Sequence, residues 1–237
     1  MIHGWTAAQV KAAEQPHLDA GEPLMQRASA GLALEVEGLL RRSGRWPAPV
    51  VLLVGSGSNG GDALFAGAAL ADRGCPVTVV PTGSRLHERG LAAAQASGVV
   101  VDDVRGWSTA EEAGAGLRRT GAAVVLDGLL GTGTSADPAL RGAARDVVAA
   151  LLPWTTGPDA PFVVAVDLPS GVGPDDGAVP DPTVLPADLT VAFGAHKAGL
   201  LMEPATSLAG EVVLVDIGLL ADLADVPPTV SVPDRAS

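Results

Sequence analysis

The sequence predicts an α/β fold, with a doubly wound, mostly parallel sheet flanked by helices in a Rossmann-like three-layer sandwich. Apolar runs of strand length recur along the chain, and most are rich in valine and continuous rather than alternating. Strands that are buried on both faces of a parallel sheet have this pattern. Helical patterns separate the runs, and 47% of the 237 residues are apolar, which is enough for a large core.

The expected strands and helices alternate from residue 50 onward. Strands are predicted at residues 50–54, 77–80, 99–101, 122–126, 162–166, 189–193 and 212–215, and helices at 61–73, 88–97, 109–119 and 138–151. Two further helices, at residues 6–18 and 23–42, precede the first strand, with Thr6 as the N-cap of the first. We expect their apolar sides to pack on the sheet or on a second subunit.

Residues 1–225 are expected to form a single domain. Residues 226–237 are polar and contain three prolines, which predicts a flexible tail or the start of an interdomain linker. Within the domain, residues 169–186 are rich in proline, glycine and aspartate and predict a long loop. Long loops in compact domains are often functional.

The charge and the ends of the chain exclude some classes of partner. The formal net charge is -12, and an acidic surface repels the phosphate backbone of nucleic acids. The first residues lack a basic segment followed by an apolar one, and no uncharged apolar stretch is long enough to span a bilayer. We therefore expect a cytoplasmic protein that binds neither nucleic acid nor membranes.

A glycine-rich segment, residues 55–62, follows the first predicted strand directly. Its glycines match G-x-G-x-x-G, which lets backbone amides approach a phosphate at the start of a helix. A dinucleotide-binding dehydrogenase also needs an acidic residue at the end of the second strand, and Val80 is followed by Pro81 and Thr82 instead. The match therefore does not imply redox chemistry. A tight turn capped by Asn59 or Asp62 is the alternative.

Two aspartates each end a buried strand and precede a loop that contains glycine. Asp127 is followed by the loop that contains Gly131 and Gly133, and Asp167 is followed by Ser170. Ligands of open α/β sheets bind at the carboxyl ends of strands, so both aspartates are in place to act. Two such carboxylates repel each other unless a cation or a proton lies between them. Turn-capping roles for Asp127 and Ser170 stay open.

Oxygen-bearing side chains at these strand ends suggest a hard cation. Asn59, Asp127 and Ser170 together would offer oxygen ligands, which suit an alkali or alkaline-earth ion rather than zinc. A fourth segment places His196 and Lys197 beyond another strand end, where either could face an anionic ligand. A structural role for His196 is the simpler interpretation. The sequence contains neither the G-x-S-x-G elbow of α/β-hydrolases nor the P-loop of nucleotide triphosphatases.

These four segments, in this order, resemble the YjeF N-terminal domain family, the NAD(P)H-hydrate epimerases. The family patterns G-x-G-N-N-G-G-D-G, D-A-x-x-G-T-G, V-D-x-P-S-G and A-D-x-T-x-x-F-G-x-x-K-x-G correspond to residues 55–63, 127–133, 166–171 and 187–199. Residues 23–28 and 210–218 are also similar to family segments, so the resemblance covers nearly the whole chain. Ser58 replaces the first asparagine of the pair, Ala63 the last glycine, and Gly128 the alanine after the aspartate.

The resemblance implies an isomerase that interconverts the R and S forms of hydrated NADH and NADPH (NADHX and NADPHX). It implies a bound potassium ion (K⁺), with Asn59, Asp127 and Ser170 as its ligands. It also implies a homodimer, and an ADP- or ATP-dependent dehydratase that is fused to the epimerase domain or works with it. The substrate contacts that it implies fall on Ser58, Asn59, Gly60, Gly61, Asp62, Gly131, Thr132, Gly133, Thr134, Ser135, Ala136, Asp137 and Asp167.

The chemistry of the reaction assigns the catalytic candidates. Epimerisation at a carbinolamine-like carbon can proceed by loss of water and its re-addition on the other face, which needs a general acid/base. Asp167 is the first candidate, and Lys197 is the second unless it contacts a phosphate. Two alternatives stay open: a non-catalytic nucleotide-binding module, which Ser58 would permit, and an NAD(P)- or S-adenosylmethionine-dependent enzyme that shares the glycine loop.

Overall fold

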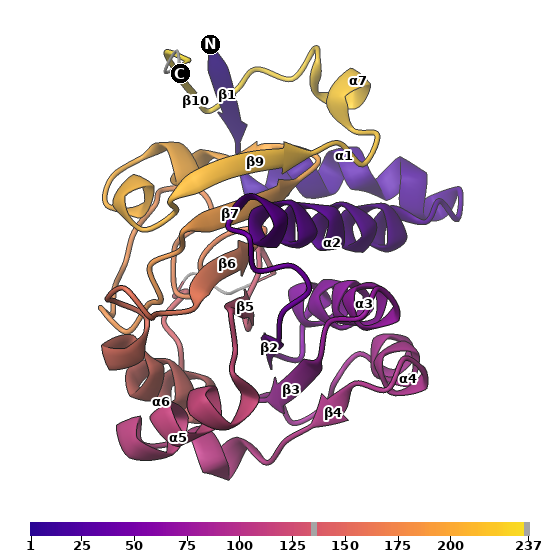
Figure 1. The fold of residues 1–237 in the computed structure, drawn as a ribbon. Helices are drawn as coiled ribbons and strands as arrows, with labels where there is room; N and C mark the ends of the chain where they lie inside the picture. The colour runs from indigo at the N-terminus through magenta and orange to yellow at the C-terminus, as the bar shows by residue number, and fades with distance from the viewer. Residues whose placement is uncertain (134–136, 235–237) are drawn as a thin grey trace.

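The computed structural model describes residues 1–133 and 137–234 and confirms the predicted doubly wound α/β fold (Figure 1). The central sheet has seven strands, all parallel, in the order β4-β3-β2-β5-β6-β7-β9. They are β2 (Val50–Val54), β3 (Val77–Pro81), β4 (Val100–Val101), β5 (Val124–Gly128), β6 (Phe162–Val166), β7 (Leu189–Phe193) and β9 (Glu211–Val215).

Helices connect the strands and cover both faces of the sheet. The α-helices are α1 (Ala7–Asp19), α2 (Leu24–Arg42), α3 (Ser58–Asp72), α4 (Glu88–Ala96), α5 (Ala110–Thr120), α6 (Gly142–Leu151) and α7 (Leu220–Leu223). Short 3₁₀ helices are η1 (Val104–Trp107), η2 (Leu152–Trp154), η3 (Ala198–Leu201) and η4 (Ala205–Ser207).

The order of the strands creates a switch point at the centre of the sheet. The chain enters the sheet at β2, runs outward through β3 and β4, and then returns to the other side of β2 with β5. The connections after β2 and β5 therefore leave the sheet toward opposite faces. In open α/β sheets this divergence opens a crevice at the carboxyl ends of the strands, where ligands bind.

Alternate residues of the central strands bury into opposite layers, as the continuous valine-rich pattern predicted. One layer is formed by α2, α3 and α4, which pack on Leu52 and Leu126. The other is formed by α5 and α6, which pack on Leu53 and Val125 (Figure 1). The predicted long loop, together with η3 and η4, covers the sheet near β7 through a third small core that contains Ala192.

The two N-terminal helices cover the same side of the sheet as α3. Thr6 caps α1 through a reciprocal capping box with Gln9, as predicted. In α2, Leu24 and Leu32 are buried in the core, whereas Leu34 remains 56% exposed. The apolar sides of the two N-terminal helices therefore pack mainly on the sheet and on α3.

A second sheet joins the two ends of the chain, which the sequence pattern did not reveal. Strand β1 (Ile2–Trp5) lies between β8 (His196–Lys197), which runs parallel to it, and β10 (Val230–Val232), which runs antiparallel. The backbone amide of Thr229 also donates to the carbonyl of Gly4 (2.8 Å). Part of the segment predicted as a tail or linker is thus hydrogen-bonded to the first strand.

Several predicted elements differ in their bounds from those observed. The helix expected at residues 61–73 is α3, which begins at Ser58, and the strand expected at residues 122–126 is β5, which ends at Gly128. The expected strand at residues 99–101 shortens to β4, and Val100 is 60% exposed, because β4 is an edge strand rather than a strand buried on both faces. The helix expected from residue 138 begins at Gly142 instead. Leu140 is buried in the core beneath α5 and α6, and Arg141 is extended with φ of -139°, so the chain enters the helix only after them.

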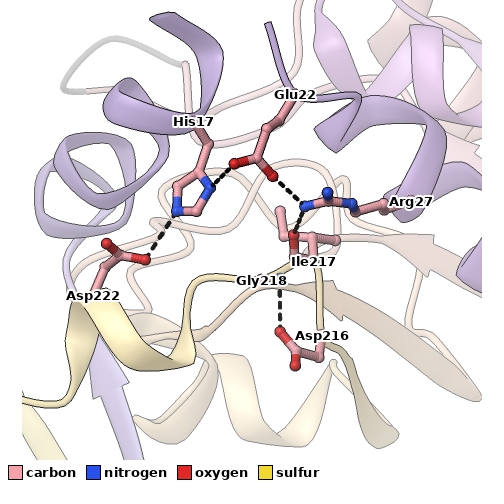
Figure 2. Close-up of polar contacts among 7 residues, drawn as sticks. All are labelled: His17, Glu22, Arg27, Asp216, Ile217, Gly218 and Asp222. Atoms are coloured by element: carbon pink, nitrogen blue, oxygen red, sulfur yellow. Dashed lines mark hydrogen bonds and ion pairs between the residues drawn. The ribbon is translucent and has the colours of Figure 1, made fainter. Parts of the chain in front are cut away.

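A charged network ties the C-terminal part of the chain to the N-terminal helices (Figure 2). The His17 ring at the end of α1 contacts Glu22 through Nδ1 and Asp222 of α7 through Nε2, both at 2.9 Å. Arg27 of α2 pairs with Glu22 at 2.8 Å and donates to the carbonyl of Ile217 at 2.9 Å. The two carboxylates hydrogen-bond the imidazole and raise the pKa of His17.

Candidate active site

The site lies at the switch point, where the connections after β2 and β5 approach each other. A Cβ atom on Gly55 would lie 1.9 Å from the carbonyl oxygen of Leu129, and one on Gly60 would lie 2.3 Å from the carbonyl oxygen of Gly55. A Cβ on Gly131 would lie 2.4 Å from Oδ1 of Asn59. These glycines are therefore required by the close packing of the two loops, in addition to any contact with a ligand.

Asn59, in the first turn of α3, holds the loops after β5 and β6 together. Its Nδ2 donates to the carbonyl of Leu130 (3.0 Å) and to the carbonyl of Val166 (2.6 Å). The side chain is 5% exposed. Asn59 therefore lies between the ends of β5 and β6.

The Asp127 carboxylate is fully buried at the end of β5 and accepts hydrogen bonds from neutral groups. Its Oδ2 accepts from the backbone amide of Ser170 (2.8 Å), and its Oδ1 accepts from the Ser170 hydroxyl (2.6 Å) and the Leu129 amide (3.3 Å). Burial raises the pKa of Asp127, against the opposing effect of these hydrogen bonds. Within the described residues, Asp127 makes no ion pair.

Asn59 and Ser170 both hydrogen-bond to the backbone of Leu130, and Ser170 links them to Asp127. The Ser170 hydroxyl accepts from the amide of Leu130 at 2.9 Å, and the carbonyl of Leu130 accepts from Asn59. Neither the site nor the rest of the described chain has three or more histidine, cysteine, aspartate or glutamate residues arranged so that they could hold a metal ion by themselves. The local ligand set is therefore made of amide, hydroxyl and carboxylate oxygens.

Asp167 has a different environment at the end of β6. Its backbone is in the left-handed region, with φ of 69°, which is uncommon for a residue other than glycine and is often found at functional sites. Oδ1 accepts from the amide of Phe193 (3.1 Å) and pairs with Nζ of Lys197, which also donates to the Phe193 carbonyl at 2.9 Å. Both side chains are buried, so Lys197 supplies the charge that opposes Asp167.

Asp167 and Lys197 line a cavity of about 190 Å³, together with Ser58, Asn59, Asp62 and Thr132. The cavity shares several lining residues with a groove of about 950 Å³, which extends along the loop that contains Pro174 and Asp176. A cavity beside a larger groove can hold a small reacting ring while the rest of a larger ligand lies outside.

Helix α1 forms a wall of this cavity, which the sequence analysis missed. Ala7, Val10, Lys11, Glu14 and Leu18 all line it, and they recur at the spacing of one helix face. The backbone amide of Ala7 donates to Asp175 at 2.6 Å, which ties the start of α1 to the far side of the groove. The charged pair Lys11 and Glu14 on an otherwise apolar face was the available signal.

The remaining predicted residues take different places. Gly61 is buried against His87 and Met25, whereas Gly133 faces open space beside the groove. Asp137 lies at the edge of the groove and pairs with Arg141. The predicted contacts at Thr134, Ser135 and Ala136 lie outside the described residues.

His196 lies on β8, beside β1, and its environment favours the structural interpretation. Its Nδ1 is buried without a hydrogen-bond partner in the described part of the chain. Burial lowers the pKa of His196, and the nearby charge of Lys197 lowers it further.

No helix among the described residues has both the length and the apolar character needed to cross a membrane.

Fold and site together define an α/β protein with a polar ligand site at the switch point of a parallel sheet. The family model described as YjeF-related protein N-terminus matches residues 21–199. The chain therefore belongs to this YjeF_N family, as the four motifs predicted. A crystal structure of yeast ynu0, YNL200c, has the same fold, with a TM-score of 0.69 and 17% identity over 90% of this chain and 87% of that one.

Curated relatives match the chain along nearly its whole length. The NAD(P)H-hydrate epimerase of Clavibacter michiganensis subsp. michiganensis is 52% identical over 227 residues, which cover 96% of this chain and 94% of the relative. The enzyme of the same name from Microbacterium testaceum is 44% identical over 230 residues, which cover 97% of this chain and 84% of the relative. The bifunctional NAD(P)H-hydrate repair enzyme Nnr of Mycobacterium tuberculosis is 40% identical over 94% of this chain but only 43% of its own length.

Proposed function

We propose that this chain is an isomerase that interconverts the R and S forms of NADHX and NADPHX, and so serves the repair of nicotinamide cofactors. The observation that carries the proposal is the buried Asp167–Lys197 pair in a cavity at the sheet's switch point. The names of the full-length relatives, NAD(P)H-hydrate epimerases, indicate the substrate.

The cavity and the groove divide the substrate between them. The hydrated nicotinamide ring would enter the cavity beside Asp167, and the rest of the nucleotide would follow the groove past Ser58 and Thr132. Helix α3 starts without a side-chain cap at Gly57, so its free amides and positive dipole end favour a pyrophosphate. This arrangement assigns binding to the two glycine loops and chemistry to the carboxylate.

Asp167 is proposed as the proton-transfer group, and Lys197 as the residue that positions it. The ion pair and the Phe193 amide fix the position of Oδ1, so a proton can be exchanged through the remaining carboxylate oxygen. Lys197 is bound by Asp167 and the Phe193 carbonyl, which argues against the alternative that it contacts a substrate phosphate.

The residues around Asp127 fit a potassium ion. Asp127 is a buried carboxylate without an ion pair in the described residues, and burial of an uncompensated charge is costly. Asn59, Asp127 and Ser170 would hold the ion, and their oxygen ligands suit a hard cation. A cation bound there would neutralise Asp127 and bind together the loops that surround the substrate.

Assembly as a homodimer remains part of the proposal. Leu34 is exposed on α2, although Leu24 and Leu32 of the same helix are buried. Sedimentation at micromolar concentration tests it: a mass of two chains supports the dimer, and a mass of one chain removes it.

The proposed epimerase needs a second enzyme, a dehydratase, to complete the repair. An epimerase alone restores no cofactor, and the curated bifunctional relatives are about twice as long as this chain's match to them. We propose that an ADP- or ATP-dependent dehydratase, fused to this domain or separate, consumes one epimer, and that both act in the cytoplasm.

The decisive assay starts from one purified epimer of NADHX. The epimers are separated by chromatography after incubation with the native chain, with the heat-denatured chain or with buffer alone. The proposal requires the native chain to bring the two epimers to equilibrium faster than either control. Binding of NADHX without faster equilibration would instead identify a non-catalytic nucleotide-binding module.

A further inference from the structure

A second carboxylate, Asp62, also lines the cavity. Whereas Asp167 is paired with Lys197, Asp62 makes no ion pair among the described residues. Asp62 lies one turn into α3, is 5% exposed and lines the same cavity as Asp167. Its Oδ1 is buried and makes no hydrogen bond in the described part of the chain. A buried carboxylate oxygen without a donor is costly when charged, and a proton on the group removes that cost.

The surrounding charges also favour the protonated form of Asp62. Burial raises the pKa of Asp62 well above its usual range, and the negative charges of Asp167 and Glu14 raise it further. Lys197 has the opposite effect, but it is the smallest of these influences and is already paired with Asp167. Asp62 and Asp167 are therefore placed in opposite environments: Asp167 is paired with the ammonium group of Lys197, whereas Oδ1 of Asp62 has no donor among the described residues.

We propose that Asp62 is the general acid of the epimerisation and that Asp167 is the matching general base. The inference rests on the proposed function, and it adds a second catalytic residue where the binding loop alone would assign only a substrate contact. Pairs of titratable groups with opposed environments in one site commonly divide the acid and base roles in this way.

In the proposed reaction, water is lost from the ring carbon and then added again. The carboxylic acid of Asp62 donates its proton to the hydroxyl on the hydrated ring carbon, and the C–O bond breaks with both electrons going to oxygen, which leaves as water. The lone pair of the adjacent ring nitrogen forms a C=N bond. A water molecule then adds to the other face of that carbon, the C=N electron pair returns to nitrogen, and Asp167 takes the proton that this water loses. Exchange of protons with solvent restores both carboxyl groups, so the net reaction is an inversion.

The substitution Asp62→Asn tests the acid role, because asparagine keeps the shape but cannot transfer a proton. We expect a fall in kcat of roughly 10²-fold or more, with KM changed little. The matched control is Asp72→Asn, at the exposed end of the same helix, which should leave kcat unchanged. Melting temperatures of both variants check that the fold is retained.

The pH profile separates an acid from a residue that only shapes the cavity. Because the acid must carry a proton, the activity of the native chain should fall as pH rises through the raised pKa of Asp62. That alkaline fall should be absent from the residual activity of the Asp62→Asn variant. An unchanged profile in the variant would overturn the acid role.

The protonation state of Asp62 can also be measured without an activity assay. Carbon NMR of the native chain with labelled aspartate carboxyls, assigned by comparison with Asp62→Asn, follows the protonation of Asp62 directly. Titration well above the usual aspartate range supports the inference, and titration within that range overturns it. If the native chain does not equilibrate the epimers at all, the proposed function fails; if it does and Asp62→Asn is fully active, only this inference fails.

Discussion

The ends of β5 and β6, which are neighbours in the sheet, carry the same kind of residue in opposite environments. Among the described residues, Asp127 accepts hydrogen bonds from the neutral groups of Ser170 and Leu129 alone, whereas Asp167 is paired with the buried ammonium group of Lys197. Both aspartates follow valine-rich strands and precede glycine-containing loops. The surrounding donors, rather than the motif, therefore decide whether a carboxylate at a strand end is suited to bind a cation or to transfer a proton.

The largest expected effect comes from removing the charge of Asp167. Asp167→Asn should lower the epimerisation rate by roughly 10²-fold or more, the usual size for a general acid/base. The variant also leaves Lys197 buried without its partner, which should lower the free energy of unfolding by about 3–5 kcal/mol. Denaturant unfolding and epimer chromatography measure the two effects separately.

A double variant distinguishes these two effects. Asp167→Asn combined with Lys197→Met removes both charges and should recover much of the lost stability, because no buried charge is left unpaired. Its activity should remain as low as that of the single variant. Recovery of activity along with stability would show that Asp167 acts through folding and not through proton transfer.

The second prediction concerns the cation and Asp127. Potassium should raise the melting temperature of the native chain, and at a concentration of 100 times the dissociation constant the gain is about 2.7 kcal/mol. Asp127→Asn should lose this response, while Asp167→Asn should keep it. Thermal scans in potassium and choline chloride compare the variants, and an equal response from all three chains would disprove the proposed site.

A smaller effect is expected from the charged network of Figure 2, which joins α1, α2 and α7. The pKa of His17 is raised above its unfolded value of about 6.5 by Asp222 and Glu22. Its contribution to stability is therefore complete below that unfolded value and is lost as pH rises through the folded pKa. Melting curves of His17→Ala and the native chain should differ most in acid and converge in alkali, and a gap that is constant with pH would contradict this.

The smallest expected effect is on net repair of the cofactor. Incubation of the chain with NADHX and ATP should restore no NADH absorbance beyond the spontaneous rate, because inversion removes no water from the product. A separately supplied ATP-dependent dehydratase should restore it. Recovery without that addition would reveal a dehydratase activity that the account excludes.

Much of the fold was predictable because the valine-rich strands and capped helices are local patterns. The proximity of Asn59, Asp127 and Ser170 was expected from the rule that ligands of open α/β sheets bind at strand ends. The pairing of Asp167 with Lys197 did not, because it joins residues 30 positions apart through side-chain directions that no periodicity encodes.

The contributions of the chain ends were the least predictable part. Helix α1 carries a weak apolar stripe, so its place beside the cavity depends on tertiary packing. Strand β10 has only three residues and was hidden in a proline-containing segment, and its partner β1 lies more than 200 positions away. Such pairings follow from the global fold and leave little trace in the local sequence.

The most direct test of the central claim follows the hydroxyl oxygen of the substrate during inversion. In the proposed mechanism, the C–O bond breaks and a new water molecule adds on the other face. One purified epimer of NADHX is incubated with the chain in heavy-oxygen water. Its inverted product should carry a solvent oxygen in place of the original hydroxyl oxygen, and mass spectrometry of the separated epimers measures this. Inversion by the native chain with the original oxygen retained would contradict the account.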